Sequence, residues 1–189
     1  KYLIEKGLNI NTLNYKSLII ASTNGNYTVV KLLIENGANV NVNQDEALCS
    51  SAYNGHFEVV KILIEKDADI FTFDNYPLRF AAFKGNYEVV KLLIENGANV
   101  HAHGNFSLLF ATSNGHYNIV KLLIENGADV HSGNDEPLIS ASQNGYFKIV
   151  KLLLENGANI HAREDKALIL ASSNNHLKVV KLLIENDAN

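Results

Sequence analysis

Hydrophobic and polar positions repeat along this chain with a period of thirty residues. Two columns carry the hydrophobic part of the pattern: Leu18, Leu48, Leu78, Leu108, Leu138 and Leu168, and the valines from Val30 to Val180 in steps of thirty. The polar part is equally regular, with lysines from Lys1 to Lys181 and a glutamate four residues after each one, from Glu5 to Glu185. Self-similarity at this spacing predicts a solenoid or a related repeat array.

The segment 105–134 shows the elements that each repeat predicts. Asn105 is expected to cap a first helix, which ends at Gly115, where glycine supplies the positive φ of a tight turn. A second helix follows, because apolar side chains recur at helical spacing: Tyr117, Val120, Leu123 and Ile124. Gly127 then stands where a left-handed C-cap belongs, and residues 128–131 are expected to run extended to the next repeat. Each repeat is therefore helix, turn, helix and short extended loop.

The predicted fold class is all-α, a solenoid of about six stacked repeats and a partial one. The boundaries follow the period: a partial repeat 1–14, then repeats 15–44, 45–74, 75–104, 105–134, 135–164 and 165–189. A single repeat buries too little apolar surface to fold alone, so stability must come from stacking neighbours. The chain has no methionine and begins with Lys1, and we expect it to be an excerpt of a longer product.

Two motifs resemble the ankyrin repeat, and the resemblance extends along the whole chain. They are Asn-Gly-His-x-x-Val-Val-Lys-x-Leu-Ile-Glu at 54–65 and Val-Val-Lys-Leu-Leu-Ile-Glu-Asn-Gly-Ala-Asn-Val at 89–100. The chain departs from the family in its period, which is usually 33, and in the Thr-Pro-Leu-His signature, which here reads Tyr-Pro-Leu-Arg at 76–79. Thirty-residue repeats rich in Asn and Lys are similar to those of giant DNA viruses of amoebae; intracellular bacteria and AT-rich protists are the alternative sources.

Three substitutions test the expected turns. Asp67 and Asp187 replace the C-cap glycine, and Asn175 replaces the glycine of the turn between the two helices. Asn and Asp are the residues other than glycine that best tolerate a left-handed backbone. We therefore expect these three residues to adopt positive φ and the fold to be kept.

Composition and charge exclude several classes of function. The net charge of -4 argues against general binding to nucleic acid or to an anionic membrane. Apolar runs are too short for a membrane span. Cys49 is the single cysteine, which excludes an internal disulfide and fits a reducing, intracellular compartment. No nucleophile elbow, Walker loop, dinucleotide fingerprint or zinc-protease motif is present, so we expect no enzyme activity, no cofactor and no small-molecule substrate.

The histidines are interpreted as structural rather than as metal ligands. His56, His116 and His176 follow the turn directly, where the family uses histidine to brace neighbouring loops. A second ladder, His101, His131 and His161, has a spacing of about 10 Å between repeats. A Zn–N bond is about 2.0–2.1 Å long, so the ladder cannot share a metal ion. We expect no metal site.

Aromatic residues depart from the repeat pattern in the middle of the chain. The candidate protein-binding residues are Tyr53, Phe73, Tyr76, Arg79 and Phe83. Aromatic residues and arginine are enriched at binding hot spots, and the same columns hold none of these aromatics in the repeat 135–164. Packing in the core is the alternative for Phe71, Phe73, Tyr76 and Phe83 and the preferred explanation for Phe80. A regular column on the second helix is interpreted as core: Tyr27, Phe57, Tyr87, Tyr117 and Phe147.

The resemblance implies a non-catalytic module that binds a host or viral protein through its concave face and loops. Two alternatives stay open: a structural or virion component that self-assembles, and a targeting arm for an effector domain outside residues 1–189. The expected location is intracellular, in the host cytoplasm or the virion.

Overall fold

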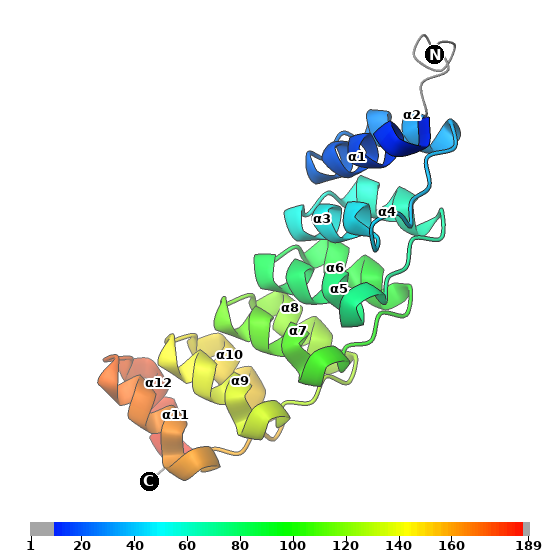
Figure 1. Cartoon of the computed structure of the whole chain (residues 1–189). Coiled ribbons are helices and arrows are strands. Elements are labelled where there is room, and N and C mark those ends of the chain that lie inside the picture. The colour runs from blue at the N-terminus through cyan, green and yellow to red at the C-terminus, as the bar shows by residue number, and fades with distance from the viewer. Residues whose placement is uncertain (1–9, 187–189) are drawn as a thin grey trace. The chain divides into compact units, whose positions relative to one another are not determined.

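The computed structural model describes residues 10–186, and in this range the chain forms twelve helices and no strand. Two compact units divide the chain, residues 1–98 and residues 99–189. Each unit contains three helix pairs (Figure 1). The predicted all-α class and the helix-turn-helix repeat are confirmed.

In the first unit, the first helix of each pair packs against its partner and against the first helix of the neighbouring pair of the same unit. The helices are α1 (Ile10–Thr23), α2 (Tyr27–Glu35), α3 (Glu46–Asn54), α4 (Phe57–Ile64), α5 (Thr72–Lys84) and α6 (Tyr87–Glu95). Helices α2, α4 and α6 stack on one another in the same way and form the second layer. Residues 1–9 of the expected partial repeat 1–14 lie outside the described residues.

The second unit has the same two layers. Its helices are α7 (Ala102–Ser113), α8 (Tyr117–Glu125), α9 (Ser132–Gln143), α10 (Phe147–Glu155), α11 (Ala162–Ser173) and α12 (Leu177–Glu185). Helices α7, α9 and α11 form one layer, and α8, α10 and α12 form the other.

The invariant columns build the core of each unit. Fully buried members are Leu18, Leu48, Leu78, Val30, Val60 and Val90 in the first unit and Leu108, Leu138, Val120 and Val150 in the second. Each contributes about 1.5–3 kcal/mol through burial of its side chain. The last members, Leu168 and Val180, are half-buried.

The turn between paired helices needs glycine for two reasons. Gly25 has a φ of +70°, and a Cβ there would lie 2.5 Å from the ring of His56, which belongs to the next repeat. The His56 ring reaches this position because its Nε2 lies 2.9 Å from the Thr23 carbonyl. Gly145 and His176 repeat the arrangement in the second unit. The predicted bracing role is therefore confirmed for both histidines.

Two of the three expected glycine replacements are confirmed. Asp67 has a φ of 62° and Asn175 a φ of 59°, so both adopt the left-handed backbone that the turn requires. Asp187 lies outside the described residues.

The loop between repeats differs from the expected extended segment. Three consecutive residues at the start of each first helix from α3 onward have φ between 46° and 67°, which makes a left-handed turn. Residues 43–45 directly precede α3, whereas 73–75, 103–105, 133–135 and 163–165 lie near the start of α5, α7, α9 and α11 and kink these helices. Such residues cost about 1–2 kcal/mol each when they carry a side chain. In the segment 128–131, which was expected to be extended, residues 130 and 131 belong to a turn, so the extended part of the loop is shorter than predicted.

The third residue of this turn fastens one loop to the next. The Asp45 carboxylate accepts a hydrogen bond from the Asp69 backbone N–H at 3.0 Å, and the Asn105 side-chain oxygen accepts one from the Asp129 N–H at 3.0 Å. Side-chain capping needs a β-region backbone at the N-cap, whereas Asn105 has a φ of 64°. The prediction that Asn105 caps its own helix is therefore replaced by a bond between repeats.

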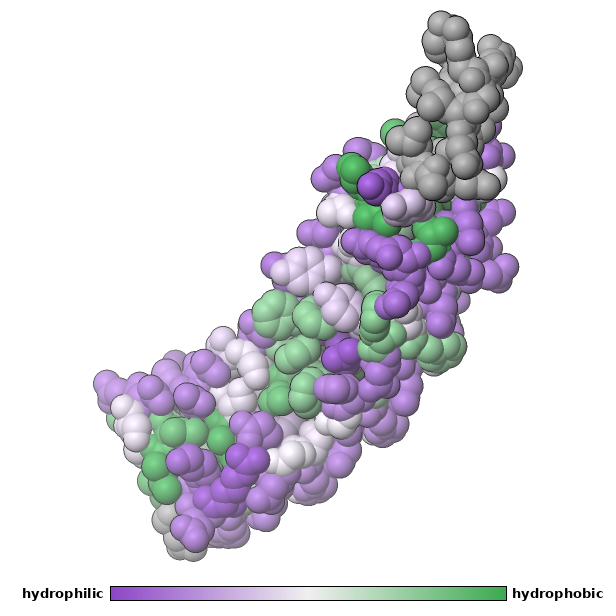
Figure 2. Space-filling view, in the orientation of Figure 1, coloured by the Kyte–Doolittle hydropathy of each residue, from purple (hydrophilic) through white to green (hydrophobic). Residues whose placement is uncertain are grey.

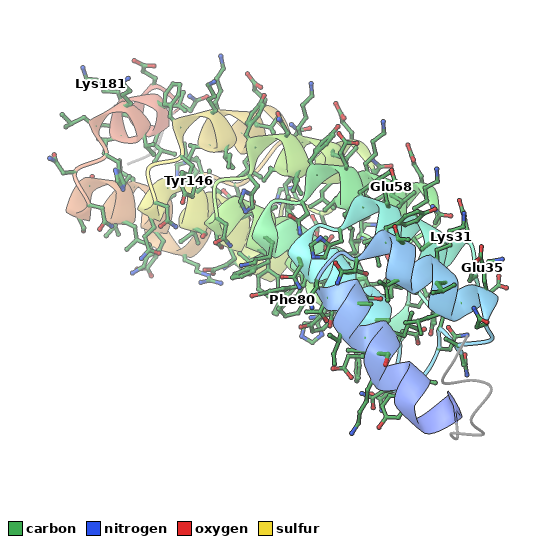
Figure 3. The ribbon with its side chains drawn as sticks, turned by 90° about the horizontal axis from the view of Figure 1, so that it is seen from above. Lys31, Glu35, Glu58, Phe80, Tyr146 and Lys181 are labelled. Carbon is green, nitrogen blue, oxygen red and sulfur yellow. The ribbon has the colours of Figure 1, made fainter. Side chains whose placement is uncertain are left out.

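The Lys and Glu columns lie on the solvent side of the second-layer helices. Figure 3 shows Lys31 and Glu35 of α2 pointing away from the ribbon. Exposed pairs form in both units, with Nζ–Oε1 distances of 3.9 Å for Lys91–Glu95 and 3.7 Å for Lys121–Glu125. Pairs of this kind contribute about 0.3–0.5 kcal/mol, so the columns serve mainly to solvate the helices.

Candidate protein-binding groove

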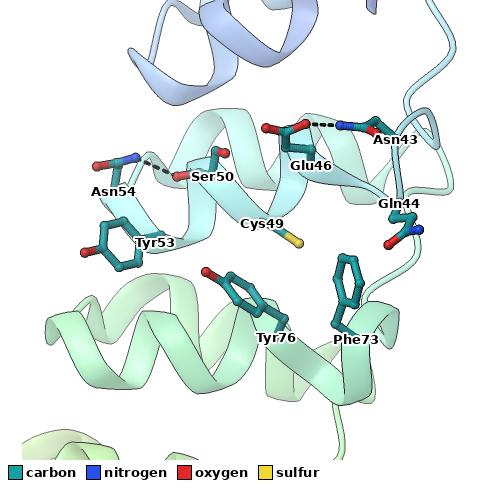
Figure 4. Close-up of a pocket in the computed structure, with 9 residues that line it drawn as sticks. All are labelled: Asn43, Gln44, Glu46, Cys49, Ser50, Tyr53, Asn54, Phe73 and Tyr76. Atoms are coloured by element: carbon teal, nitrogen blue, oxygen red, sulfur yellow. Dashed lines mark hydrogen bonds between the residues drawn. The ribbon is translucent and has the colours of Figure 1, made fainter.

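A groove opens in the first unit between α3 and α5, with a volume of about 530 Å³. Its walls are shown in Figure 4: Asn43, Gln44, Glu46, Cys49, Ser50, Tyr53, Asn54, Phe73 and Tyr76. Three of these residues, Tyr53, Phe73 and Tyr76, are among the five predicted binding residues. The groove therefore brings together most of the aromatic patch expected from the sequence.

Helix α3 presents one face to the groove. The five lining residues of this helix are Glu46, Cys49, Ser50, Tyr53 and Asn54. Their spacing of three, four, seven and eight residues from the first places them on a single side of an α-helix. The sequence interpretation did not include Glu46, Ser50 or Asn54, although this spacing could have indicated them.

The left-handed turns supply the opposite rim. Residues 43–45 present Asn43 and Gln44 to the groove, and residues 73–75 present Phe73. The Phe73 side chain is 56% exposed, which leaves a large apolar surface in contact with solvent. Its backbone has a φ of 46°.

Aromatic rings form a connected cluster along α5. The Tyr76 ring stacks on Phe80 with centroids 3.9 Å apart, and Phe73 meets Tyr76 edge-on at 6.4 Å. Phe80 also contacts Tyr53 and Phe83, each at 6.2 Å. Aromatic pairs of this geometry add about 0.5–1.5 kcal/mol beyond the area they bury. Phe83 therefore supports the cluster through Phe80 and does not line the groove.

Arg79 lies beneath this surface. It is only 9% exposed, and its guanidinium donates to the carbonyl of Phe73 at 2.7 Å and to that of Asp74 at 3.0 Å. These bonds fix the left-handed turn from inside. Arg79, predicted as a protein-binding residue, is thus placed by the structure beneath the groove, where it positions Phe73.

Burial keeps the uncharged groups of the groove neutral. It raises the pKa of the Cys49 thiol to about 12, with further contributions from Asp45 and Glu46. Burial also raises the pKa of the Tyr76 hydroxyl. Cys49 is buried, and its thiol is protonated at neutral pH. Glu46 is the one carboxylate among the lining residues, and none of them is a cation.

Two expectations about other aromatics are wrong. Four members of the column interpreted as core are between 36% and 39% exposed: Tyr27, Tyr87, Tyr117 and Phe147. Each is the first residue of its helix, so no preceding turn covers it. The second is the alternative of a core position for Phe71, which is instead 54% exposed, whereas Phe80 is half-buried in the cluster.

The second histidine ladder stabilises the loops of the second unit. The Nδ1 atoms of His131 and His161 lie 3.1 Å and 2.9 Å from the carboxylates of Asp135 and Asp165. Within residues 10–186, no group of three or more His, Cys, Asp or Glu side chains is arranged to hold a metal ion. In the same range, no helix has both the length and the apolar character needed to cross a membrane.

Comparison with known proteins places the chain in a family. The family model described as ankyrin repeats (3 copies) matches residues 1–44, 18–104, 48–134, 78–164 and 108–189. Since these matches span the whole length, the chain belongs to the ankyrin repeat family. The crystal structure of the human ASB11 ankyrin repeat domain is similar, with 27% identity, a TM-score of 0.83, and coverage of 91% of this chain and 84% of that chain. No curated protein sequence matches this chain significantly.

Proposed function

We propose that this chain is a non-catalytic protein-binding module and that the α3–α5 groove is its principal contact site. Ankyrin repeat domains generally mediate protein–protein interactions, and the family is established by the match along the chain. The observation that carries the proposal is the groove itself, where three exposed or half-buried aromatic rings surround a volume of about 530 Å³.

The composition of the groove favours a protein over other ligands. Tyrosine and phenylalanine supply large, rigid contact area, and amide side chains from Asn43, Gln44 and Asn54 supply adaptable hydrogen bonds. The single carboxylate disfavours phosphate groups, in agreement with the sequence-based expectation of no nucleic-acid partner. In this proposal Tyr53, Phe73 and Tyr76 contact the partner, while Phe83 and Arg79 hold them in place.

Photo-crosslinking at two exposed aromatic positions of the first unit tests the proposal. A benzophenone amino acid replaces Phe73 in one variant and Tyr87, which is 37% exposed on α6, in the matched control. We expect a partner from host-cell lysate to be captured from position 73 and not from position 87. The Phe73→Ala, Tyr76→Ala double variant should lose the same partner in a pull-down, while Tyr27→Ala, Tyr87→Ala should keep it. Capture from position 87 alone would contradict the proposal.

Self-assembly is the second candidate, and one surface of the second unit favours it. Figure 2 shows apolar surface over α11, where Ile169 is 49% exposed, and Leu177 and Ile184 of α12 are 64% and 56% exposed. Sedimentation velocity over a hundredfold concentration range tests this candidate. A Leu177→Lys variant that abolishes concentration-dependent association would support it, and a strict monomer would contradict it.

Four points remain predictions from the sequence. They are the source of the partner (host or viral), the similarity to repeats of giant DNA viruses, the intracellular location and the targeting-arm alternative. Each becomes testable once the crosslinked partner is identified.

A further inference from the structure

The equivalent position in the second unit of this chain indicates what the α3–α5 groove binds. Residues of α3 and α5 correspond to residues of α9 and α11 ninety positions later, so Glu46 matches Glu136 and Phe73 matches Arg163. In the second unit the Arg163 guanidinium lies 2.7 Å from the Glu136 carboxylate and donates to the Gly133 carbonyl at 2.6 Å. The second unit thus supplies its own guanidinium at this position.

The backbone that presents the two side chains is the same in both units. Phe73 has a φ of 46° and Arg163 a φ of 51°, and each is the first residue of its left-handed turn. Gly133, whose carbonyl accepts the bond from Arg163, corresponds to Asn43 of the groove. The acceptors that hold Arg163 therefore have counterparts in the first unit: the Glu46 carboxylate and the Asn43 carbonyl.

Among the described residues of the first unit, no cation takes the place that Arg163 has in the second. Phe73 takes the place of the arginine, and the Glu46 carboxylate accepts a hydrogen bond from the Asn43 side-chain amide. No ion pair of Glu46 is formed within residues 10–186. Two nearby cations are committed elsewhere, since Arg79 is bonded to the Phe73 and Asp74 carbonyls and the Lys84 ammonium lies 4.8 Å from the centre of the Tyr53 ring.

The walls of the groove suit the rest of an arginine side chain. Guanidinium groups stack on aromatic faces and pair with carboxylates through two parallel hydrogen bonds. Phe73 and Tyr76 provide the aromatic faces, and Cys49 between them is a neutral, apolar floor for the methylene stem (Figure 4). A lysine ammonium matches this combination less well, because it is a compact and strongly hydrated charge.

We propose that the α3–α5 groove binds an arginine side chain of the partner protein, with its guanidinium on the Glu46 carboxylate and the Asn43 carbonyl and its stem against Phe73 and Tyr76. The inference rests on the proposed function and specifies arginine as the side chain by which the partner is recognised. In the first unit the partner's guanidinium takes the position that the Arg163 guanidinium has in the second unit.

The test uses blocked pentapeptides of glycine with a central arginine, citrulline or lysine, titrated against ¹⁵N-labelled protein. Citrulline keeps the shape of arginine and removes its charge. We expect the arginine peptide to shift the amide signals of residues 43–46 and 73–76 and to bind about tenfold more tightly than the citrulline peptide, as for a charge-assisted pair. Equal binding of the two peptides, or shifts confined to other surfaces, would overturn the proposal.

Three variants locate the charge. Glu46→Gln should weaken binding of the arginine peptide about tenfold, whereas Glu136→Gln, the matched control, should leave it unchanged because Arg163 already occupies that site. Phe73→Arg should abolish binding, since the chain then fills its own groove. Arg163 shows that this backbone position accepts arginine. An unaltered affinity in Glu46→Gln would refute the role of the carboxylate.

The two proposals fail in different ways. If position 73 crosslinks a partner that Glu46→Gln binds with undiminished affinity, the groove is a binding site and the arginine inference is wrong. If the arginine peptide binds in a Glu46-dependent way but position 73 captures no partner, the chemistry of the groove is right and the proposed function is wrong.

Discussion

The α3–α5 face of the first unit and the α9–α11 face of the second share one backbone scaffold. Their surface side chains differ, because the first is aromatic and the second polar and basic. Both have a left-handed turn at the start of each first helix and a fully buried leucine, Leu48 or Leu138, at the same position. On the surface, the rings of Tyr53, Phe73 and Tyr76 are matched by Gln143, Arg163 and Lys166 ninety residues later. The backbone therefore does not require aromatics in these columns, and their presence in the first unit calls for an explanation outside the fold.

The largest expected effect tests whether the scaffold is truly shared. Leu48→Ala and Leu138→Ala each remove a fully buried side chain, and each should lower the free energy of unfolding of its unit by about 2–5 kcal/mol. Urea denaturation followed by hydrogen exchange reports the two units separately. A cost below about 1 kcal/mol for one variant only would show that the two faces are packed differently.

A smaller effect is expected from the residue that holds the groove open. Arg79→Ala removes two charge-assisted hydrogen bonds to the turn at 73–75 and should cost about 1–3 kcal/mol. The matched control is Ile169→Ala, ninety residues later, where the side chain is 49% exposed and the cost should be under about 1 kcal/mol. Faster amide exchange at residues 73–75 in the first variant alone would confirm the positioning role, and unchanged exchange would disprove it.

The smallest effect concerns the bond between loops and depends on pH. Burial raises the pKa of Asp45 above 3.8, so the folded state binds this proton more tightly than the unfolded chain does. Its contribution to stability is therefore lost as the pH rises from about 3.8 through the folded-state pKa. Asp45→Asn removes this loss, and Asn105 shows that an amide oxygen makes the same bond to the next loop.

We expect Asp45→Asn to raise the stability at neutral pH, and the gain should shrink as the pH falls through the folded-state pKa of Asp45 toward 3.8. Thermal unfolding of both proteins as a function of pH measures the difference. A gain that is independent of pH would exclude ionisation of Asp45 as its cause.

The repeat period is sufficient to predict the fold, and it does not predict the loops. The leucine and valine columns occur in every full repeat and the glycine columns in most, so each one reports a packing or turn requirement directly. The left-handed turns were not predicted because residues as different as Phe73 and Arg163 occupy the same strained position. Their backbone is imposed by bonds to neighbouring loops and, at Phe73, by Arg79, which no local propensity reveals.

The candidate site was predicted in part. The aromatics stood out because they break the repetition, and Tyr53, Phe73 and Tyr76 do line the groove. Glu46 did not stand out, because Glu136 has the same residue type; only the contacts of Arg163 show that the two glutamates differ in their partners. Arg79 lies close to the aromatics in sequence, which suggests a shared role. Its burial follows from the packing of the folded chain and is not visible in the sequence.

The bonds between loops also bear on how such a chain folds and lengthens. Asp45 reaches 24 residues forward to Asp69, and His56 reaches 33 residues back to Thr23. Each bond therefore closes a short stretch of chain, and the entropy lost on closure is nearly the same for every repeat. Folding can begin in any pair of neighbours at comparable speed. A gene encoding such a chain can gain or lose whole thirty-residue segments by recombination. Each repeat brings the side chains that bond to its neighbours, so the loop-to-loop hydrogen bonds can form again at the new junction.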